Sequence, residues 1–550
     1  MPAMSISLSS HSNPTPTPFS HFTIVTAEEV KRLISSMPAK SSPIDYIPVK
    51  ILKEQVEVLA PLVTRLANLS LSSGVFPSSL KTGQVTPLLK KPGLNPSDPA
   101  NYRPITNLST ISKIIEKLAL CRLRQHIVES ASFCRFQSAY RAAHSTETAL
   151  LRVVNDLVMT ACNKCPSMLI ALDISAAFDT IDHDILCQRA NSDFGFQDTA
   201  LAWLRSFVSG RSNYVCVNNA RSPVTQCSSG VPQGSVLGPI LFALYTSPVA
   251  KIIIRHGLQY HMYADDTQLY TALKQNKQNN IDLTVIQQCT NDIHRWYAEN
   301  GMLLNPTKSE AMAVGTRAQV AAASASGAVV VAGKRVPLSD SVKLLGVTID
   351  SLLSFDKHVT NVVRGCNYHL RSLRHIRPLI TSEVAKIVAC SMVFSRLDYC
   401  NALLYDTTDK NVKKLQTVQN DLARVVLQAN RQTSAKQSLR TLHWLPIKYR
   451  IDYKIAVTVY KLRQSHLPSY LSELIVDYQP ARTLRSSDKL LLRELGGPVR
   501  KLALSSKSFS VSGPAVWNSL PFNCRECNDF TTFKRLLKSE LFIRANNVNT

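Results

Sequence analysis

Hydrophobic and polar residues alternate on both sides of an acidic pair near the middle of the chain. In residues 258–263 and 267–272 the apolar positions recur at every second residue, a pattern that predicts β-strands. Asp265 and Asp266 stand between these runs, so the pattern predicts a β-hairpin with both carboxylates at or beside its tip. Adjacent carboxylates repel each other unless solvent or a cation offsets their charge. A solvated turn and a site for a divalent cation such as Mg²⁺ both fit the pair taken alone.

A short apolar run earlier in the chain ends directly at a third carboxylate. Residues 167–172 predict a buried strand, and Asp173 follows it. An acid at the end of a buried strand lies at the rim of its sheet, where it can hold a metal ion. Only the tertiary fold can bring Asp173 close to Asp265. Nucleotidyl transfer with two metal ions needs such a cluster, because one ion activates the attacking hydroxyl and the other stabilises the leaving pyrophosphate.

Glycines are concentrated between these acids, in residues 230–239. Glycine permits unusual φ values and a close approach of the backbone to a ligand, although an ordinary loop has the same composition. The apolar run 240–245 predicts a helix that begins within or directly after this turn.

Helical patterns dominate the two ends of the chain. Residues 1–22 are rich in Ser and Pro and predict disorder. A capping box at Thr26 predicts a helix start, and residues 49–73 predict one long amphipathic helix. In residues 368–377 an apolar stripe lies beside a basic one, which suits either a helix along duplex phosphates or a solvated helix face. The basic stripe consists of Arg371, Arg374 and Arg377.

Composition narrows the class of partner. A chain of 550 residues is too long for one compact domain, and its 45% hydrophobic content supports sizeable cores. The net charge of +25 favours a polyanionic partner, with nucleic acid first and an anionic membrane surface second. Thirteen irregularly spaced cysteines indicate free thiols in a reducing compartment. No apolar run is long enough to span a membrane and no secretory signal is present, so we expect a nuclear or cytoplasmic protein that is not secreted.

The segments, taken in this order, resemble the reverse transcriptases of LINE-type (non-LTR, jockey-like) retrotransposons. The central matches are ALDISAAFDTIDHDIL, SSGVPQGSVLGPILFALY and YADDTQLY. The flanking matches are LKTGQVTPLLKKPGLNPSDPANYRPITNLSTISKIIEKL, FQSAYRAAHSTETALLRVVND, NGMLLNPTKSEAM and VKLLGVTID. The likeness runs from about residue 75 to 350 and continues more weakly through SRLDYCNALLY and LHWLPIKYRI. Ordered blocks are far more specific than any single motif.

The resemblance implies an α+β fold: a right-hand polymerase with fingers, a palm built on an antiparallel sheet, a helical thumb, and a mainly helical, basic C-terminal region. The expected boundaries are 1–24 for a disordered leader, 25–74 for a helical connector, 75–350 for fingers and palm, 351–430 for the thumb and 431–550 for a basic region of unknown role.

The implied activity is RNA-directed DNA synthesis, in which a primer 3′-hydroxyl is extended with deoxynucleoside triphosphates on an RNA template. Asp173, Asp265 and Asp266 are the expected catalytic residues and ligands of two Mg²⁺ ions, with Mn²⁺ as a substitute. Template RNA, primer DNA and dNTP are the expected partners, and no membrane is involved. If the chain is complete, an endonuclease activity must come from elsewhere, because only about 75 residues precede the likeness.

Further site residues are carried over from the resemblance. Arg103 is the preferred clamp for the triphosphate, because a guanidinium binds phosphate bidentately. Phe178 corresponds to the aromatic residue that excludes a 2′-hydroxyl, and Lys308 to the lysine that neutralises pyrophosphate. The expected nucleotide-binding set is Arg103, Lys90, Phe178, Gln233, Gly234 and Lys308. Leu345 and Gly346 are expected to form the primer grip, and Arg371, Arg374 and Arg377 to contact nucleic acid. Solvated basic loops and a core position for Phe178 remain the alternatives.

Two other functions stay open at this point. The chain can be an inactive retrotransposon remnant that only binds nucleic acid, although all three carboxylates are present. It can also be an RNA-templated RNA polymerase, against which Phe178 argues, because ribonucleotide selection needs a polar group near the 2′-hydroxyl.

Overall fold

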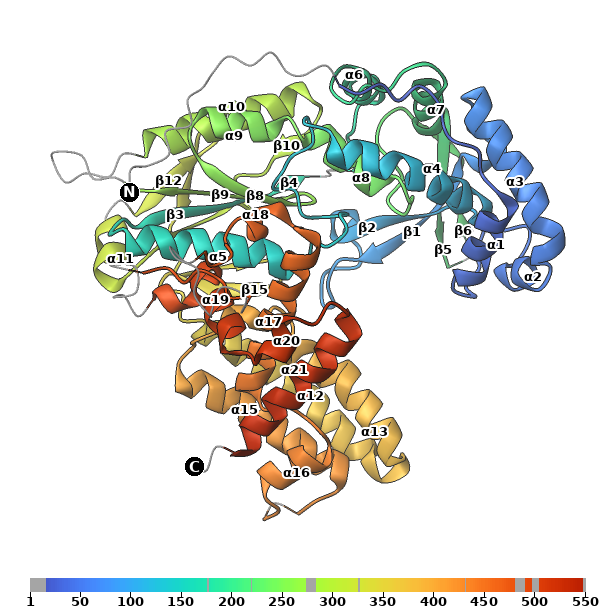
Figure 1. Cartoon of the computed structure of the whole chain (residues 1–550). Coiled ribbons are helices and arrows are strands. Elements are labelled where there is room, and N and C mark those ends of the chain that lie inside the picture. Colours follow the sequence, from blue (N-terminus) through green and yellow to red (C-terminus); the bar gives the residue numbers. More distant parts are fainter. Residues whose placement is uncertain are drawn as a thin grey trace. The chain divides into compact units, whose positions relative to one another are not determined.

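The protein is described here by a computed structural model (Figure 1). It describes residues 16–175, 178–218, 220–273, 283–324, 327–430, 432–479, 490–496 and 504–547. The chain forms two compact units, each assembled from separate stretches of sequence. The first unit contains the described residues of Met1–Tyr140, Ile174–Arg255 and Asp292–Asn305; the second contains those of Arg141–Asp173, His256–Asn291 and Pro306–Thr550.

The first unit is built on a mixed sheet with the strand order β2-β1-β5-β6, and β7 also pairs with β5. Its strands are β1 (Thr82–Leu89), β2 (Tyr102–Asn107), β5 (Arg211–Val217), β6 (Ala220–Arg221) and β7 (Thr225–Cys227), with β4 (Ile174–Ser175) paired to β10 (Leu303–Leu304) in a separate ladder. Its helices are α1 (Ala27–Ser36), α2 (Val49–Glu54), α3 (Val56–Ser73), α4 (Thr110–Glu129), α6 (His183–Ser192), α7 (Asp198–Val208), α8 (Gly238–Thr246) and α9 (Val249–Arg255). Helix α10 (Thr284–Glu299) has residues in both units.

The N-terminal helices belong to the core of this first unit. Helix α1 packs on α3 and α4, and α3 also packs on α7. The one long helix expected over residues 49–73 is wrong, because Gln55 leaves the helical region with φ −109° and ψ 30° and separates α2 from α3.

The prediction of a disordered leader over residues 1–24 is wrong for the last residues of that segment. The backbone N–H of Phe19 donates to the carbonyl of Gly195 at 2.8 Å, and the Phe19 ring packs on Phe22 and Phe196. Residues 16–24 therefore join the packed unit, because their aromatic side chains find apolar partners there. Residues 1–15 lie outside the described residues.

The second unit is built on an antiparallel sheet with the strand order β11-β3-β9-β8. Its strands are β3 (Ser167–Leu172), β8 (Gln259–Tyr263), β9 (Asp266–Ala272) and β11 (Glu310–Val314), and two further hairpins join β12 (Ala328–Val331) to β13 (Lys334–Pro337) and β14 (Ser341–Leu344) to β15 (Val347–Asp350). Helix α5 (Thr146–Cys162) packs against β3 and β8, as Figure 1 shows. Most residues of these four strands are buried, and the exposed ones lie at strand ends.

Helices make up most of the second unit beyond the sheet. They are α11 (Arg317–Ser324), α12 (Asp356–Ile376), α13 (Ser382–Ala389), α14 (Ser395–Leu397), α15 (Asp409–Leu427), α16 (Ala435–Thr441), α17 (Ile447–Ser465), α18 (Ser469–Ser472), α19 (Phe509–Ser519), α20 (Phe522–Arg525) and α21 (Phe530–Asn547). Short 3₁₀ turns in this unit cover Arg377–Leu379, Asn401–Leu404 and Ser505–Lys507, and a π-helical turn covers Cys390–Phe394. The 3₁₀ turns Ser78–Leu80 and Pro99–Asn101 belong to the first unit.

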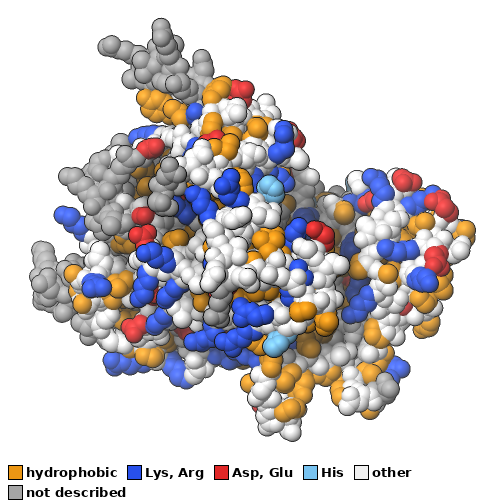
Figure 2. Space-filling model, turned by 90° about the horizontal axis from the view of Figure 1, so that it is seen from below, with side chains coloured by type: hydrophobic (Ala, Val, Ile, Leu, Met, Phe, Trp, Pro, Cys, Tyr) orange, Lys and Arg blue, Asp and Glu red, His pale blue; other side chains and the backbone are white. Residues whose placement is uncertain are grey.

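Two expectations about the whole chain can be compared with the structure. All thirteen cysteines are free thiols, as the sequence predicts. Within the described part of the chain, no helix is both long and apolar enough to cross a bilayer. Lys and Arg side chains recur across the face in Figure 2, in keeping with the net charge.

Candidate active site

The acidic pair lies at the tip of the β8–β9 hairpin, as the alternation of residues predicts. Tyr263 pairs with Asp266, so Ala264 and Asp265 form a two-residue turn. Ala264 has a φ of 57°, a left-handed conformation that a non-glycine residue rarely adopts. Strained backbone of this kind is concentrated at functional sites, where the surrounding structure maintains it.

The register of the sheet brings Asp173 to the same place. Leu172 pairs with Thr267 across β3 and β9. Continuing this antiparallel register by one residue sets Asp173 opposite Asp266, and directly opposed residues have Cβ atoms about 5 Å apart. Asp173, Asp265 and Asp266 therefore meet at one edge of the sheet in the second unit, although long stretches of sequence separate them.

Burial and like charges act together on the carboxylate of Asp266 at this edge. The pKa of Asp266 is raised to about 6, first by burial and then by the charges of Asp265 and Asp173. Among the described residues, no three His, Cys, Asp or Glu side chains are already grouped as a metal site. The donors nevertheless suit a hard divalent cation, because they are carboxylate oxygens whose mutual repulsion a cation relieves. The fit rests on charge and donor chemistry, and not on a preformed coordination shell.

A buried polar network behind the hairpin could not be predicted from the sequence. The Tyr270 hydroxyl of β9 donates to Asp156 Oδ2 at 2.8 Å, and Arg152 Nε donates to the same oxygen at 2.8 Å. Both partners lie on α5, so the helix holds the strand that begins with Asp266. No local pattern distinguishes these positions from other polar residues on a helix.

The glycine-rich turn lies in the first unit and is bonded to two neighbouring segments. The Gln233 side-chain amide donates to Asp179 Oδ2 at 2.8 Å, and the N–H of Thr106 donates to the Gln233 carbonyl at 2.8 Å. Gly234 has a φ of 139°, and an added Cβ would lie 2.3 Å from the Thr106 carbonyl oxygen. Only glycine fits this position. The turn is thereby held against strand β2, which carries Arg103.

Phe178 lies beside this turn. Its carbonyl accepts from the N–H of Val231 at 2.9 Å, and its ring stacks on Phe242 with the centroids 4.9 Å apart. The ring is half-buried. It is therefore packed against α8 and still has an accessible surface.

A buried glutamate that the sequence analysis missed anchors the end of the turn. The Glu116 carboxylate accepts hydrogen bonds from the N–H groups of Val236 and Leu237, at 2.7 and 3.3 Å, and from the Ser112 hydroxyl at 3.0 Å. Burial raises the pKa of Glu116, and nearby Arg211 acts in the opposite direction. The carboxylate satisfies N–H groups at the start of α8 that have no partner within the helix.

Arg103 and Lys90, the predicted phosphate-binding residues of the first unit, differ in whether their side chains already make hydrogen bonds. Arg103 is exposed on β2, and no hydrogen bond of its guanidinium is found among the described residues. Lys90 is also exposed, but its Nζ donates to the carbonyl of Ala100 at 2.7 Å. Arg103 is thus the freer of the two for an incoming anion.

In the second unit Lys308 and the expected primer grip occupy exposed turns. Lys308 directly precedes Ser309, whose hydroxyl accepts from the Asp173 N–H at 3.4 Å, so the neighbouring residue of the lysine contacts the acidic cluster. Leu345 and Gly346 form the β14–β15 turn, with φ values of 45° and 84°. The Tyr399 hydroxyl donates to the Leu345 carbonyl at 2.6 Å and fixes this turn.

The basic stripe of α12 is shorter than expected. Arg371 and Arg374 are exposed, but Arg377 is only 8% exposed. Its guanidinium donates to the carbonyls of Val426 at 3.0 Å and Ile380 at 2.8 Å. The prediction that Arg377 contacts nucleic acid is therefore corrected: this side chain joins the end of α12 to α15.

Comparisons with known proteins show which sequences this chain resembles. Residues 89–349 match the family model described as reverse transcriptase (RNA-dependent DNA polymerase). The RNA-directed DNA polymerase from mobile element jockey of Drosophila melanogaster is 30% identical over 351 residues, which cover 62% of this chain and 36% of that protein. The probable RNA-directed DNA polymerase from transposon BS of the same species is 25% identical over 86% of this chain and 52% of its own length.

The chain spans only part of these relatives, between 36% and 52% of the two described here. Among solved structures, a telomerase from Candida albicans in complex with a fragment of telomeric RNA matches 80% of this chain and 73% of its own, with 13% identity and a TM-score of 0.36.

Proposed function

We propose that this chain is the RNA-directed DNA polymerase of a LINE-type, non-LTR retrotransposon, because residues 89–349 match the reverse transcriptase family model. The observation that carries the proposal is the convergence of Asp173 with the acidic tip of the β8–β9 hairpin, inside the matched segment. The substrates are proposed to be a primer 3′-hydroxyl, a dNTP and an RNA template. In this reading the first unit contains the fingers and part of the palm, and the second contains the catalytic strands and the helical thumb.

Asp173, Asp265 and Asp266 would hold two divalent cations, which we propose to be Mg²⁺. Bound there, the ions supply activation of the primer hydroxyl and neutralisation of the leaving pyrophosphate. The chain's own residues bind and orient the reactants. Their proposed roles are triphosphate binding for Arg103 and Lys90, exclusion of a 2′-hydroxyl for Phe178, contact with the nucleotide for Gln233 and Gly234, charge neutralisation for Lys308, primer contact for Leu345 and Gly346, and phosphate contact for Arg371 and Arg374.

Primer extension tests this function directly. On poly(rA) annealed to oligo(dT), with Mg²⁺ or Mn²⁺, the protein is expected to incorporate dTTP and to discriminate against UTP, because Phe178 leaves no polar partner for a 2′-hydroxyl. The measurement is the length of the extended primer on a denaturing gel, with EDTA as the control. Equal use of UTP would favour an RNA polymerase, and binding without extension would identify an inactive remnant.

Metal binding can be tested without turnover. Because a cation relieves the repulsion at the cluster, Mg²⁺ is expected to raise the Tm of the wild-type protein. At ten times the dissociation constant, a single site stabilises the fold by about 1.4 kcal/mol. Calorimetric Tm values are compared with and without Mg²⁺ for the wild type and for Asp173→Asn, which should lose most of the increase. An equal increase in both proteins would show that Mg²⁺ binds elsewhere.

A further inference from the structure

A cavity of about 590 Å³ lies within the second unit, away from the acidic cluster in sequence. Its wall combines three aromatic side chains with three cationic ones. They are Phe394, Trp444 and Tyr453, and Arg450, Lys454 and Lys538. A cavity of this size accommodates one nucleotide-sized ligand, and stacking surfaces beside cations are the usual means of binding single-stranded nucleic acid.

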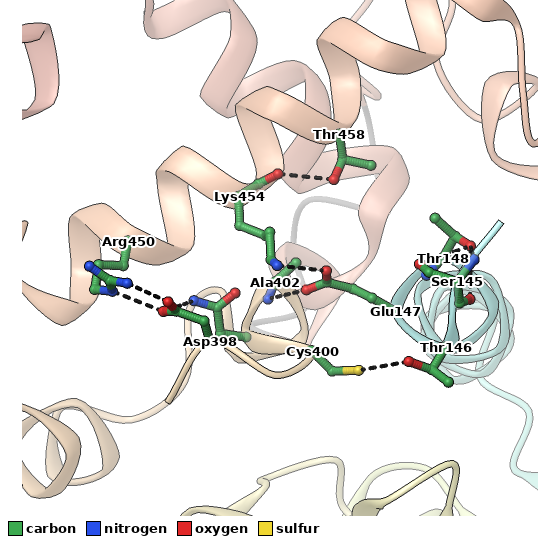
Figure 3. A network of polar contacts seen from close by, with 11 residues as sticks. Ser145, Thr146, Glu147, Thr148, Asp398, Cys400, Ala402, Arg450, Lys454 and Thr458 are labelled. Carbon is green, nitrogen blue, oxygen red and sulfur yellow. Dashed lines mark hydrogen bonds and ion pairs between the residues drawn. The ribbon is translucent and has the colours of Figure 1, made fainter. Parts of the chain in front are cut away.

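Ion pairs hold two of the cations in place, as Figure 3 shows. Arg450 donates through Nε to Asp398 Oδ1 at 2.8 Å and through Nη2 to Oδ2, and its guanidinium lies 4.2 Å from the centroid of the Phe394 ring. Lys454 lies 3.3 Å from Glu147 Oε2, and Glu147 Oε1 also accepts from the Ala402 N–H at 3.1 Å. Both cations are therefore positioned before any ligand arrives.

The same pairs limit the charge of a suitable ligand. Asp398 and Glu147 offset much of the charge of Arg450 and Lys454, whereas Lys538 is exposed on α21 and has no ion-pair partner among the described residues. One phosphodiester suits this balance better than a triphosphate. The nonionic part of a ligand would meet the aromatic side chains.

Trp444 supplies the principal stacking surface. Its ring is half-buried and meets the Phe394 ring edge to face, with the centroids 4.7 Å apart and an interplanar angle of 87°. A base stacked on such an indole is recognised with little regard to its identity, since every base presents a π-face.

The cavity adjoins a second cavity, and Gly346 of the expected primer grip lines this second one. This neighbour, of about 530 Å³, is lined by Lys343, Gly346, Arg396 and Tyr399, and Ser395 lines both cavities. The segment Ser395–Tyr399 thus forms a wall shared by the two cavities. The two cavities are therefore neighbours in the second unit.

We propose that the cavity at Trp444 binds one unstacked nucleotide of a single strand continuing from the primer-grip turn, with its base on Trp444 and its phosphate at Arg450 and Lys538. The choice of a polynucleotide as ligand rests on the proposed function. Single-stranded RNA and single-stranded DNA both present a base and a phosphodiester to this cavity, and separate RNA and DNA probes distinguish between them.

Binding measured by fluorescence anisotropy tests the proposal independently of catalysis. The probes are fluorescein-labelled oligo(rA), oligo(dA) and a blunt DNA duplex of equal length. Trp444→Ala is expected to weaken the binding of a single strand by roughly 10-fold and to leave duplex binding unchanged, because only an unstacked base uses the indole. Trp444→Phe should retain most of the affinity. A larger loss for oligo(rA) than for oligo(dA) would identify RNA as the preferred strand.

Lys538→Ala tests the proposed binding site if Trp444→Ala fails to fold. The lysine is exposed, so its substitution should leave the fold intact. Removing one phosphate contact should lower the slope of log K against log salt by about 0.7 for a single strand. Lys251→Ala, which removes one exposed lysine from α9, is the charge-matched control and should leave this slope unchanged. Equal effects of Lys538→Ala on single strands and duplex, or none on either, would overturn the proposal. If primer extension fails while these differences persist, the polymerase function is wrong and the binding site is not.

Discussion

Asp265→Asn is expected to abolish primer extension while nucleic-acid binding stays near the wild-type level. The substitution removes the charge of the carboxylate at the hairpin tip, beside Asp266, and keeps the size of the side chain. Charge stabilisation by catalytic metal ions contributes several kcal/mol, so the expected loss of rate is about 10³-fold or more. Binding rests on many separate basic contacts and should change little.

Single-turnover extension on poly(rA)/oligo(dT) and anisotropy with the same duplex measure the two properties separately. Asp409→Asn, which removes a carboxylate from the first turn of α15 in the same unit, is the matched control and should extend primers normally. Full activity of Asp265→Asn would refute the assignment of the acidic cluster. Loss of both binding and extension would indicate that the variant is misfolded, and circular dichroism would then decide.

The acidic site was predictable because its signals are local. Period-two alternation on both sides of Asp265 and Asp266 specifies the hairpin, and the apolar run before Asp173 specifies the strand. Their register across β3 and β9 could be inferred only from the requirement of the chemistry. The structure supplies that register independently.

What the sequence did not reveal depends on tertiary contacts. The bond between Tyr270 and Asp156 joins a strand to a distant helix, and neither position stands out in its own segment. Arg377 continues the spacing of the basic stripe and yet is buried, because α15 offers it carbonyl acceptors. Residues 16–24 have the composition of a disordered leader, but aromatic packing by Phe19 outweighs that tendency.

Glu116→Ala is expected to destabilise the first unit severely, because the change leaves several buried polar groups without a partner. The N–H groups of Val236 and Leu237 would lose their acceptor at the start of α8. Arg211, which is 2% exposed and faces the rings of Phe76 and Phe207, would lose the nearby carboxylate. Leaving a buried hydrogen-bonding group without its partner costs about 1–3 kcal/mol.

Urea unfolding of Glu116→Ala and Glu116→Gln separates the two contributions to this loss. Glutamine keeps an acceptor for both N–H groups and can donate to Ser112, but it carries no charge for Arg211. Its loss of stability should therefore lie between those of the wild type and the alanine variant. Equal stability of Glu116→Ala and the wild type would show that water replaces the carboxylate, and Glu116 would then not hold the turn. If glutamine is as destabilising as alanine, the charge of Glu116 matters more than its hydrogen bonds. If glutamine matches the wild type, the hydrogen bonds alone hold Gln233 and Gly234 against β2.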